Sequence, residues 1–127
     1  MNTRRFDQRI AVVTGGGSGI GKSIVLALAD EGAAVAIVDS DATAAEALAF
    51  AVRERGGSAI ACAMDAGDPA AAEAMINEVR ARFGNPNILV NNTRGGRHGK
   101  RPARESLSFL AREMHAILQP TLVMTDT

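Results

Sequence analysis

The segment Ile10-Ala-Val-Val-Thr-Gly-Gly-Gly-Ser-Gly-Ile-Gly21 decides the fold of this chain. Its first five residues form an apolar run, which is typical of a β-strand buried on both faces of a parallel sheet. The glycines that follow predict a sharp turn, because glycine adopts left-handed backbone angles without steric cost. From Ile20 to Asp30 apolar residues recur at spacings of three and four, which predicts a helix that Gly32 ends. The segment therefore predicts a strand, a glycine turn and a helix in succession.

The same alternation of strand and helix continues along most of the chain. We expect further strands at residues 34–38, 58–64 and 87–91, and helices between them at residues 42–55 and 68–83. Apolar strands that alternate with helices indicate an α/β fold with a doubly wound parallel sheet, and right-handed crossovers leave few topologies. We therefore expect about four strands in the order 3-2-1-4, with helices flanking the sheet.

The last third of the sequence breaks this pattern. Residues 93–104 are rich in glycine and basic side chains, which predicts a solvated loop. Residues 105–118 return to helical spacing, and after Pro120 the tail suits either a continued helix or an extended segment. We treat residues 1–127 as a single domain, because a chain of this length with 46% hydrophobic residues supports one packed core.

Charge and composition exclude several classes of partner. The 14 basic and 14 acidic side chains cancel, so no overall field attracts nucleic acid or an anionic membrane. Aromatic residues make up only 3% of the chain, which disfavours base-stacking surfaces. No long apolar run indicates a membrane span or a signal peptide, and the single cysteine, Cys62, has no internal disulfide partner. We therefore expect a cytoplasmic protein with Cys62 in its core and no metal site.

The place of the glycine turn predicts a dinucleotide site. In doubly wound sheets a pyrophosphate binds where the first strand passes into the first helix, because backbone amides and the helix N-terminus attract an anion there. Asp39 ends the second predicted strand, 18 residues after Gly21, and an acid at this place can hydrogen-bond both ribose hydroxyls of an adenosine. It would also repel a 2′-phosphate, and Ser40 and Asp41 supply no positive charge.

These charges predict NAD as the cofactor and make NADP less favoured. Two plainer roles stay open at this stage. The glycines can form a tight structural turn, and Asp39 can cap the helix that follows it.

The motifs Thr14-Gly-x-x-x-Gly-Ile-Gly21, Asp39, Asp65 and Leu89-Val-Asn-Asn92 follow one another in an order that resembles the short-chain dehydrogenases/reductases. The resemblance covers residues 8–92 and implies a Rossmann-type fold with hydride transfer between NAD and an alcohol or carbonyl. It also implies that Asp65 contacts the adenine and that Asn91 steadies the sheet and lines the cofactor site. The expected cofactor-binding residues are Gly15, Ser18, Gly19, Ile20, Gly21, Asp39, Asp65 and Asn91.

The C-terminal part departs from the family pattern. Thr93-Arg94 replaces the family's Ala-Gly, and the segment with the family's catalytic Ser, Tyr and Lys does not follow. The chain has no tyrosine, which is the general acid of this family's reaction. We therefore expect no catalytic residues in this truncated chain and little or no dehydrogenase activity. A second alignment matches residues 122–126 to a later Pro-Gly-x-Val-x-Thr segment of the family, and it requires a large internal deletion.

Two hypotheses follow for the function. The first is an NAD-binding oxidoreductase of the short-chain type. The alternative is a non-catalytic fragment or pseudoenzyme that acts through nucleotide or partner binding. A sheet that stops at its fourth strand leaves that strand as an exposed edge, which tends to pair with another chain. We therefore expect a homo-oligomer.

Overall fold

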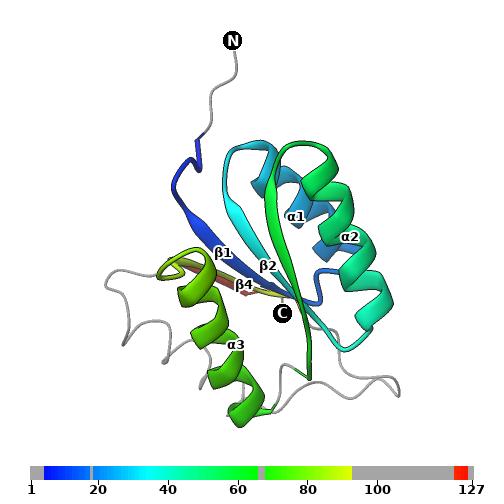
Figure 1. Cartoon of the computed structure of the whole chain (residues 1–127), viewed down its shortest axis with the longest axis vertical. Coiled ribbons are helices and arrows are strands. Elements are labelled where there is room, and N and C mark those ends of the chain that lie inside the picture. The colour runs from blue at the N-terminus through cyan, green and yellow to red at the C-terminus, as the bar shows by residue number, and fades with distance from the viewer. Residues whose placement is uncertain (1–4, 18, 66–67, 93–121, 126–127) are drawn as a thin grey trace.

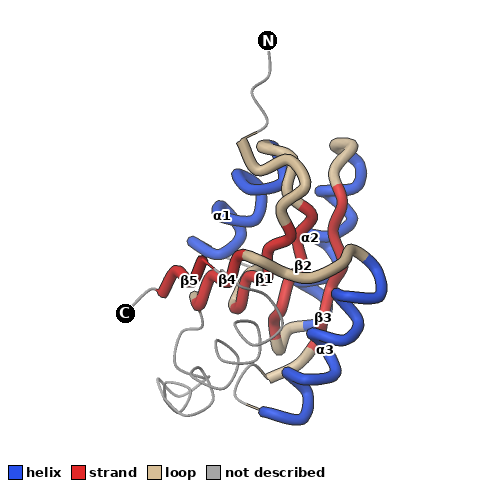
Figure 2. Tube along the Cα trace, turned by 90° about the vertical axis from the view of Figure 1, so that its left-hand side faces the viewer, coloured by secondary structure: helices blue, strands red, loops and turns tan. Residues whose placement is uncertain are grey.

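The chain forms a five-stranded parallel sheet with helices on both faces (Figures 1 and 2). The computed structural model describes residues 5–17, 19–65, 68–92 and 122–125. The strands follow the order β3-β2-β1-β4-β5. The described elements are β1 (Ile10–Thr14), α1 (Gly19–Asp30), β2 (Ala34–Asp39), α2 (Ala42–Glu54), β3 (Ser58–Ala63), α3 (Pro69–Arg82), β4 (Ile88–Asn91) and β5 (Leu122–Thr125). The doubly wound class and the strand order 3-2-1-4 predicted from the sequence are confirmed.

The fifth strand corrects one expectation. β5 pairs in parallel with β4, with Leu122 opposite Ile88 and Thr125 opposite Asn91. β4 therefore lies between β1 and β5, and the expectation that β4 is an exposed edge is wrong. The short apolar segment after residue 121 supplies the covering strand, so the tail is extended at residues 122–125. The predicted loop 93–104 and helix 105–118 lie outside the described residues.

Self-association stays a prediction, but an exposed β4 edge no longer supports it. A covered β4 no longer offers its backbone groups to another chain.

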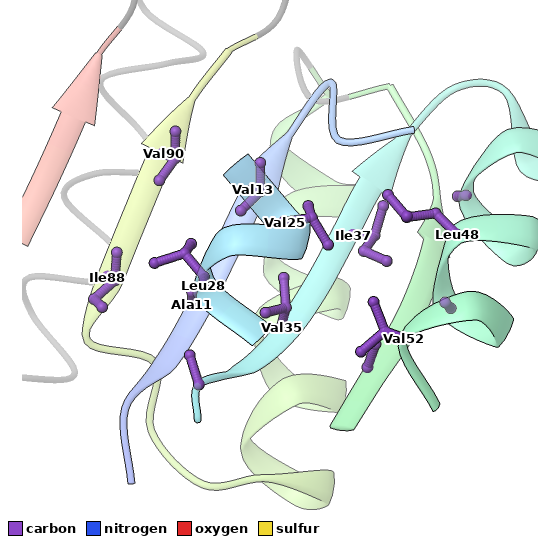
Figure 3. Close-up of a cluster of buried hydrophobic side chains, with 14 residues drawn as sticks. Ala11, Val13, Val25, Leu28, Val35, Ile37, Leu48, Val52, Ile88 and Val90 are labelled. Atoms are coloured by element: carbon purple, nitrogen blue, oxygen red, sulfur yellow. The ribbon is translucent and has the colours of Figure 1, made fainter. Parts of the chain in front are cut away.

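Side chains of the strands alternate between two cores, as the period of a β-strand requires. Val13 and Ile37 point to the face that α1 and α2 cover (Figure 3). Val12 and Val38, their neighbours in sequence, point to the face that α3 covers. Figure 1 shows α1 and α2 on one side of the sheet and α3 on the other. Burial on both faces explains why the strands are apolar throughout rather than alternately polar.

Aspartates fix the starts of two helices. The Asp41 carboxylate accepts a hydrogen bond from the Ala44 amide at 3.1 Å and caps α2. The Asp68 carboxylate accepts one from the Ala70 amide at 3.1 Å and caps α3, with Pro69 in the first turn. Each cap satisfies an amide that has no partner within its helix. Because Asp41 caps α2, Asp39 is not the cap of that helix.

Candidate dinucleotide site

The turn between β1 and α1 lies at the carboxyl edge of the sheet. Gly15 and Gly19 have φ angles of 64° and 61°, in the left-handed region that favours glycine. The amides of Gly15 and Gly16 donate to the Val38 carbonyl oxygen at 2.7 and 3.3 Å, which ties the turn to the end of β2. Ser18, an expected site residue, lies outside the described residues. The turn is therefore held at a defined place beside β2.

The turn has a packed inner side and an open outer side. A Cβ atom built at Gly21 would overlap the Gly15 carbonyl oxygen and lie 2.6 Å from Asn92 Nδ2. A Cβ atom at Gly19 would meet no atom of the described residues within 4 Å. Next to it, the Ile20 side chain is 53% exposed at the start of α1. The open side, with the amides of a helix N-terminus, has the features of an anion-binding turn.

A buried threonine links the turn to β4. Thr14 is fully buried, and its Oγ1 accepts a hydrogen bond from the Asn92 amide at 2.9 Å. The same hydroxyl donates to the Val90 carbonyl oxygen at 3.3 Å. The Asn92 side-chain amide in turn donates to the Gly15 carbonyl oxygen at 3.4 Å. These contacts fix the start of the turn against the end of β4, and this role of Thr14 and Asn92 was not predicted from the sequence.

The Asp39 carboxylate faces the glycine turn. Its Oδ2 accepts a hydrogen bond from the Gly17 amide at 2.9 Å, and its Oδ1 accepts one from the Asp41 amide at 2.9 Å. The Asp39 carbonyl oxygen accepts from the Met64 amide at 3.1 Å, which joins the ends of β2 and β3. A carboxylate has about four acceptor positions, so two donors leave room for further hydroxyl groups. The acid is thus oriented by the backbone before any ligand binds.

Asp65 and Asn91 extend the same edge on either side. Asp65 follows β3 by two residues, beyond Ala63, which pairs with Asp39. Asn91 ends β4, pairs with Thr14 and is only 4% exposed. Its Oδ1 is buried and has no hydrogen-bond partner among the described residues. Of the expected site residues, all except Ser18 are described, and the sheet gathers them at the carboxyl ends of its strands.

Other chemistry is sparse in the described residues. They contain no group of three or more His, Cys, Asp or Glu that could hold a metal ion. None of the described helices is long and apolar enough to cross a membrane. Burial raises the pKa of the Cys62 thiol to about 11, so this side chain is a neutral core residue at ordinary pH, as expected.

A parallel doubly wound sheet with a glycine turn after β1 and an acid at the end of β2 defines a dinucleotide-binding fold. The family model described as "short chain dehydrogenase" matches residues 9–126. The chain belongs to the short-chain dehydrogenase family.

Known members of the family are similar to this chain over most of its length. It is 37% identical to the 7alpha-hydroxysteroid dehydrogenase of Escherichia coli K12 over 92 residues, which are 72% of this chain and 36% of that protein. It is 44% identical to the D-threitol dehydrogenase of Mycolicibacterium smegmatis over 87 residues, which are 68% of this chain and 34% of that protein. With the levodione reductase of Leifsonia aquatica it shares 35% identity over 122 residues, which are 94% of this chain and 44% of that protein.

Solved structures show the same fold. A hydroxysteroid dehydrogenase from Escherichia coli superposes with a TM-score of 0.87 at 28% identity and covers 98% of this chain. A 7 alpha-hydroxysteroid dehydrogenase in complex with NADH and 7-oxo glycochenodeoxycholic acid gives a TM-score of 0.87 at 25% identity and covers 99% of this chain. The matches cover 56% and 55% of those two chains, so this chain spans about half the length of its solved relatives.

Proposed function

We propose that these residues form the NAD-binding half of an oxidoreductase that transfers hydride between NAD and an alcohol or carbonyl. The observation that supports the proposal best is the orientation of Asp39. Backbone amides of Gly17 and Asp41 hold its two oxygens at the mouth of the glycine turn. A carboxylate fixed in this way is suited to accept hydrogen bonds from the two ribose hydroxyls of an adenosine.

The remaining parts of the dinucleotide fit the same edge. The pyrophosphate would lie on the open side of the turn at Gly19, where the backbone is uncovered and α1 begins. The cofactor would also cover the exposed apolar side chain of Ile20. Asp65 would contact the adenine, and the buried Oδ1 of Asn91 would accept a donor near the nicotinamide half. The proposed contacts are Gly15, Ser18, Gly19, Ile20, Gly21, Asp39, Asp65 and Asn91.

Charge favours NAD over NADP in this proposal. A 2′-phosphate on the adenosine ribose would approach the carboxylates of Asp39 and Asp41. Ser40 lies between them, and Gly17 faces them from the turn, so neither neighbour offers a positive charge. The negative phosphate and the negative carboxylates would repel each other, and the partial burial of Asp39 reduces the screening of this repulsion by salt.

Binding and turnover are separable here. The 127 residues contain no tyrosine, so the proton donor that the family's reaction uses has no counterpart among them. We therefore propose that the 127-residue chain binds NAD and does not reduce or oxidise an alcohol or carbonyl at a measurable rate. Formation of NADH, followed by its absorbance with a panel of secondary alcohols, would refute this part of the proposal.

The binding proposal is tested by calorimetric titration of the purified chain with NAD and, separately, with NADP. We expect binding of NAD, and at least about tenfold weaker binding after Asp39→Ala, since two hydrogen bonds to a charged acceptor are lost. The matched control is Asp30→Ala, because it also removes one carboxylate, but Asp30 pairs with Arg55 at the far end of α1. Equal NAD affinity in the Asp39→Ala and Asp30→Ala variants, or no NAD binding by the unmodified chain, would overturn the assignment.

A further inference from the structure

Among the described strands β3 is an edge of the sheet, since the strand order begins with β3 and its partner within the sheet is β2. Its sequence, Ser58-Ala-Ile-Ala-Cys-Ala63, contains no charged residue and no proline. Edge strands usually carry such residues because they prevent another strand from pairing with the free backbone groups. β3 therefore has the composition of an interior strand at an edge position.

Arg53, in the last turn of α2, supplies the missing charge. Its Nη1 donates a hydrogen bond of 2.9 Å to the carbonyl oxygen of Ala59 in β3. This oxygen points away from β2: the Met64 amide faces β2, since it donates to the Asp39 carbonyl oxygen, and Ala59 lies five residues before Met64, an odd number. Backbone groups alternate in direction along a strand, so the amides of Ala61 and Ala63 point to the same outer side.

An exposed apolar side chain lies on the side of α2 that carries Arg53. Phe50 is 60% exposed, and it stands three residues before Arg53, so the two share a face of α2. A second strand laid along β3 would therefore gain backbone hydrogen bonds and an apolar contact. The bond from Arg53 to the Ala59 carbonyl oxygen removes one of the required acceptors and places a cation in the path of that strand.

We propose that Arg53 closes the β3 edge against pairing with a second copy of this chain. The partner would be another β3, since that strand offers the same uncharged sequence and free outer groups. The proposal rests on the strand order, the uncharged sequence of β3, the exposed Phe50 and the Arg53 contact, and it does not depend on nucleotide binding.

The experiment compares Arg53→Met with Arg55→Met by sedimentation velocity over a range of concentrations. Both variants lose one guanidinium at the end of α2, but the Arg55 guanidinium pairs with Asp30 at 2.6 Å, whereas that of Arg53 donates to Ala59 in β3. We expect self-association of the Arg53→Met variant to strengthen on the order of tenfold, because the acceptor is freed and the charge is gone. The Arg55→Met variant should sediment like the unmodified chain.

Hydrogen exchange identifies the surface used. In the associated Arg53→Met variant, we expect slower exchange at the amides of Ala61 and Ala63. Adding Ala61→Pro removes one outer amide that β2 does not use and should reverse the association. Unchanged sedimentation of Arg53→Met, or association without protection of β3, overturns the proposal. If Arg53→Met does not fold, Arg53→Ala is measured instead, since alanine also removes both the charge and the donor, and association no stronger than in the unmodified chain then overturns the proposal.

Discussion

Replacement of Thr14 by valine tests how the glycine turn is held. The substitution preserves shape and volume but removes the hydroxyl that accepts from the Asn92 amide and donates to the Val90 carbonyl oxygen. Thr14 is fully buried, so water cannot replace the lost partner of the amide. An unsatisfied buried donor costs about 1–3 kcal/mol, and the longer contact to Val90 adds little. We therefore expect a loss of about 2 kcal/mol in the free energy of unfolding.

Thermal and urea unfolding measure this loss. At roughly 4 °C per kcal/mol for a chain of this size, the melting temperature should fall by about 8 °C. Thr14→Ser is the matched control, because it keeps the hydroxyl and loses only a methyl group, for about 1 kcal/mol. NAD affinity should fall in the valine variant more than in the serine variant, since only valine releases the turn from β4. If valine is as stable as the unmodified chain, or less damaging than serine, the hydrogen bonds do not hold the turn.

Two further predictions concern the turn and the core. Gly21→Ala forces a Cβ atom into the Gly15 carbonyl oxygen, so it should lower the free energy of unfolding by about 3 kcal/mol and abolish NAD binding. Gly56→Ala is the control, because Gly56 has a φ of 86° but no described atom lies within 4 Å of the added Cβ. It should cost about 1 kcal/mol and leave NAD binding unchanged. Calorimetry and thermal melts of the two variants measure both effects, and NAD binding by Gly21→Ala would contradict the packing argument. Folding raises the pKa of Cys62 from 9.0 to about 11, so the unfolded chain loses the thiol proton at a lower pH than the folded chain. The contribution of the buried neutral thiol to folding stability is therefore complete below pH 9.0 and is lost as the pH rises toward 11. Urea unfolding at several pH values should show a shallower decline over this range in Cys62→Ala, and identical slopes would contradict the assignment.

Local patterns in the sequence were sufficient for the central fold. The apolar run before the glycines, the helical spacing after them and the aspartates at helix starts are each encoded within a few residues. Strand order then followed from the rule that crossovers are right-handed and short. β5 was not predicted, because four residues after a proline carry too little pattern to separate a strand from a continued helix. Its identity as a strand depends on the free side of β4, which is a tertiary property.

The sequence named candidate site residues, which remain a prediction, but it did not indicate the contacts that support them. Asp39 could be located because an acid at the end of the second strand has a defined place in this fold. The contact of Thr14 with the Asn92 amide joins residues 78 positions apart, and no local pattern predicts such a contact. Gly21 was expected among the cofactor-binding residues, and the structure gives it a further role, because its missing side chain leaves room for the Gly15 carbonyl oxygen. Both supports depend on how β4 meets the turn.

The turn therefore serves the fold on one side and is available to a ligand on the other. Gly21 and Thr14 lie on the packed side, so changes there should reduce stability and NAD affinity together. Asp39 is held by amides of Gly17 and Asp41 at a half-exposed place, where the helix cap is supplied by Asp41. Loss of the Asp39 carboxylate removes one part-buried and one exposed hydrogen bond and no member of the two core clusters, so it should reduce NAD affinity more than stability. If some substitutions reduce both stability and NAD affinity while Asp39→Ala reduces mainly NAD affinity, the sheet sets the geometry of the site before the ligand binds.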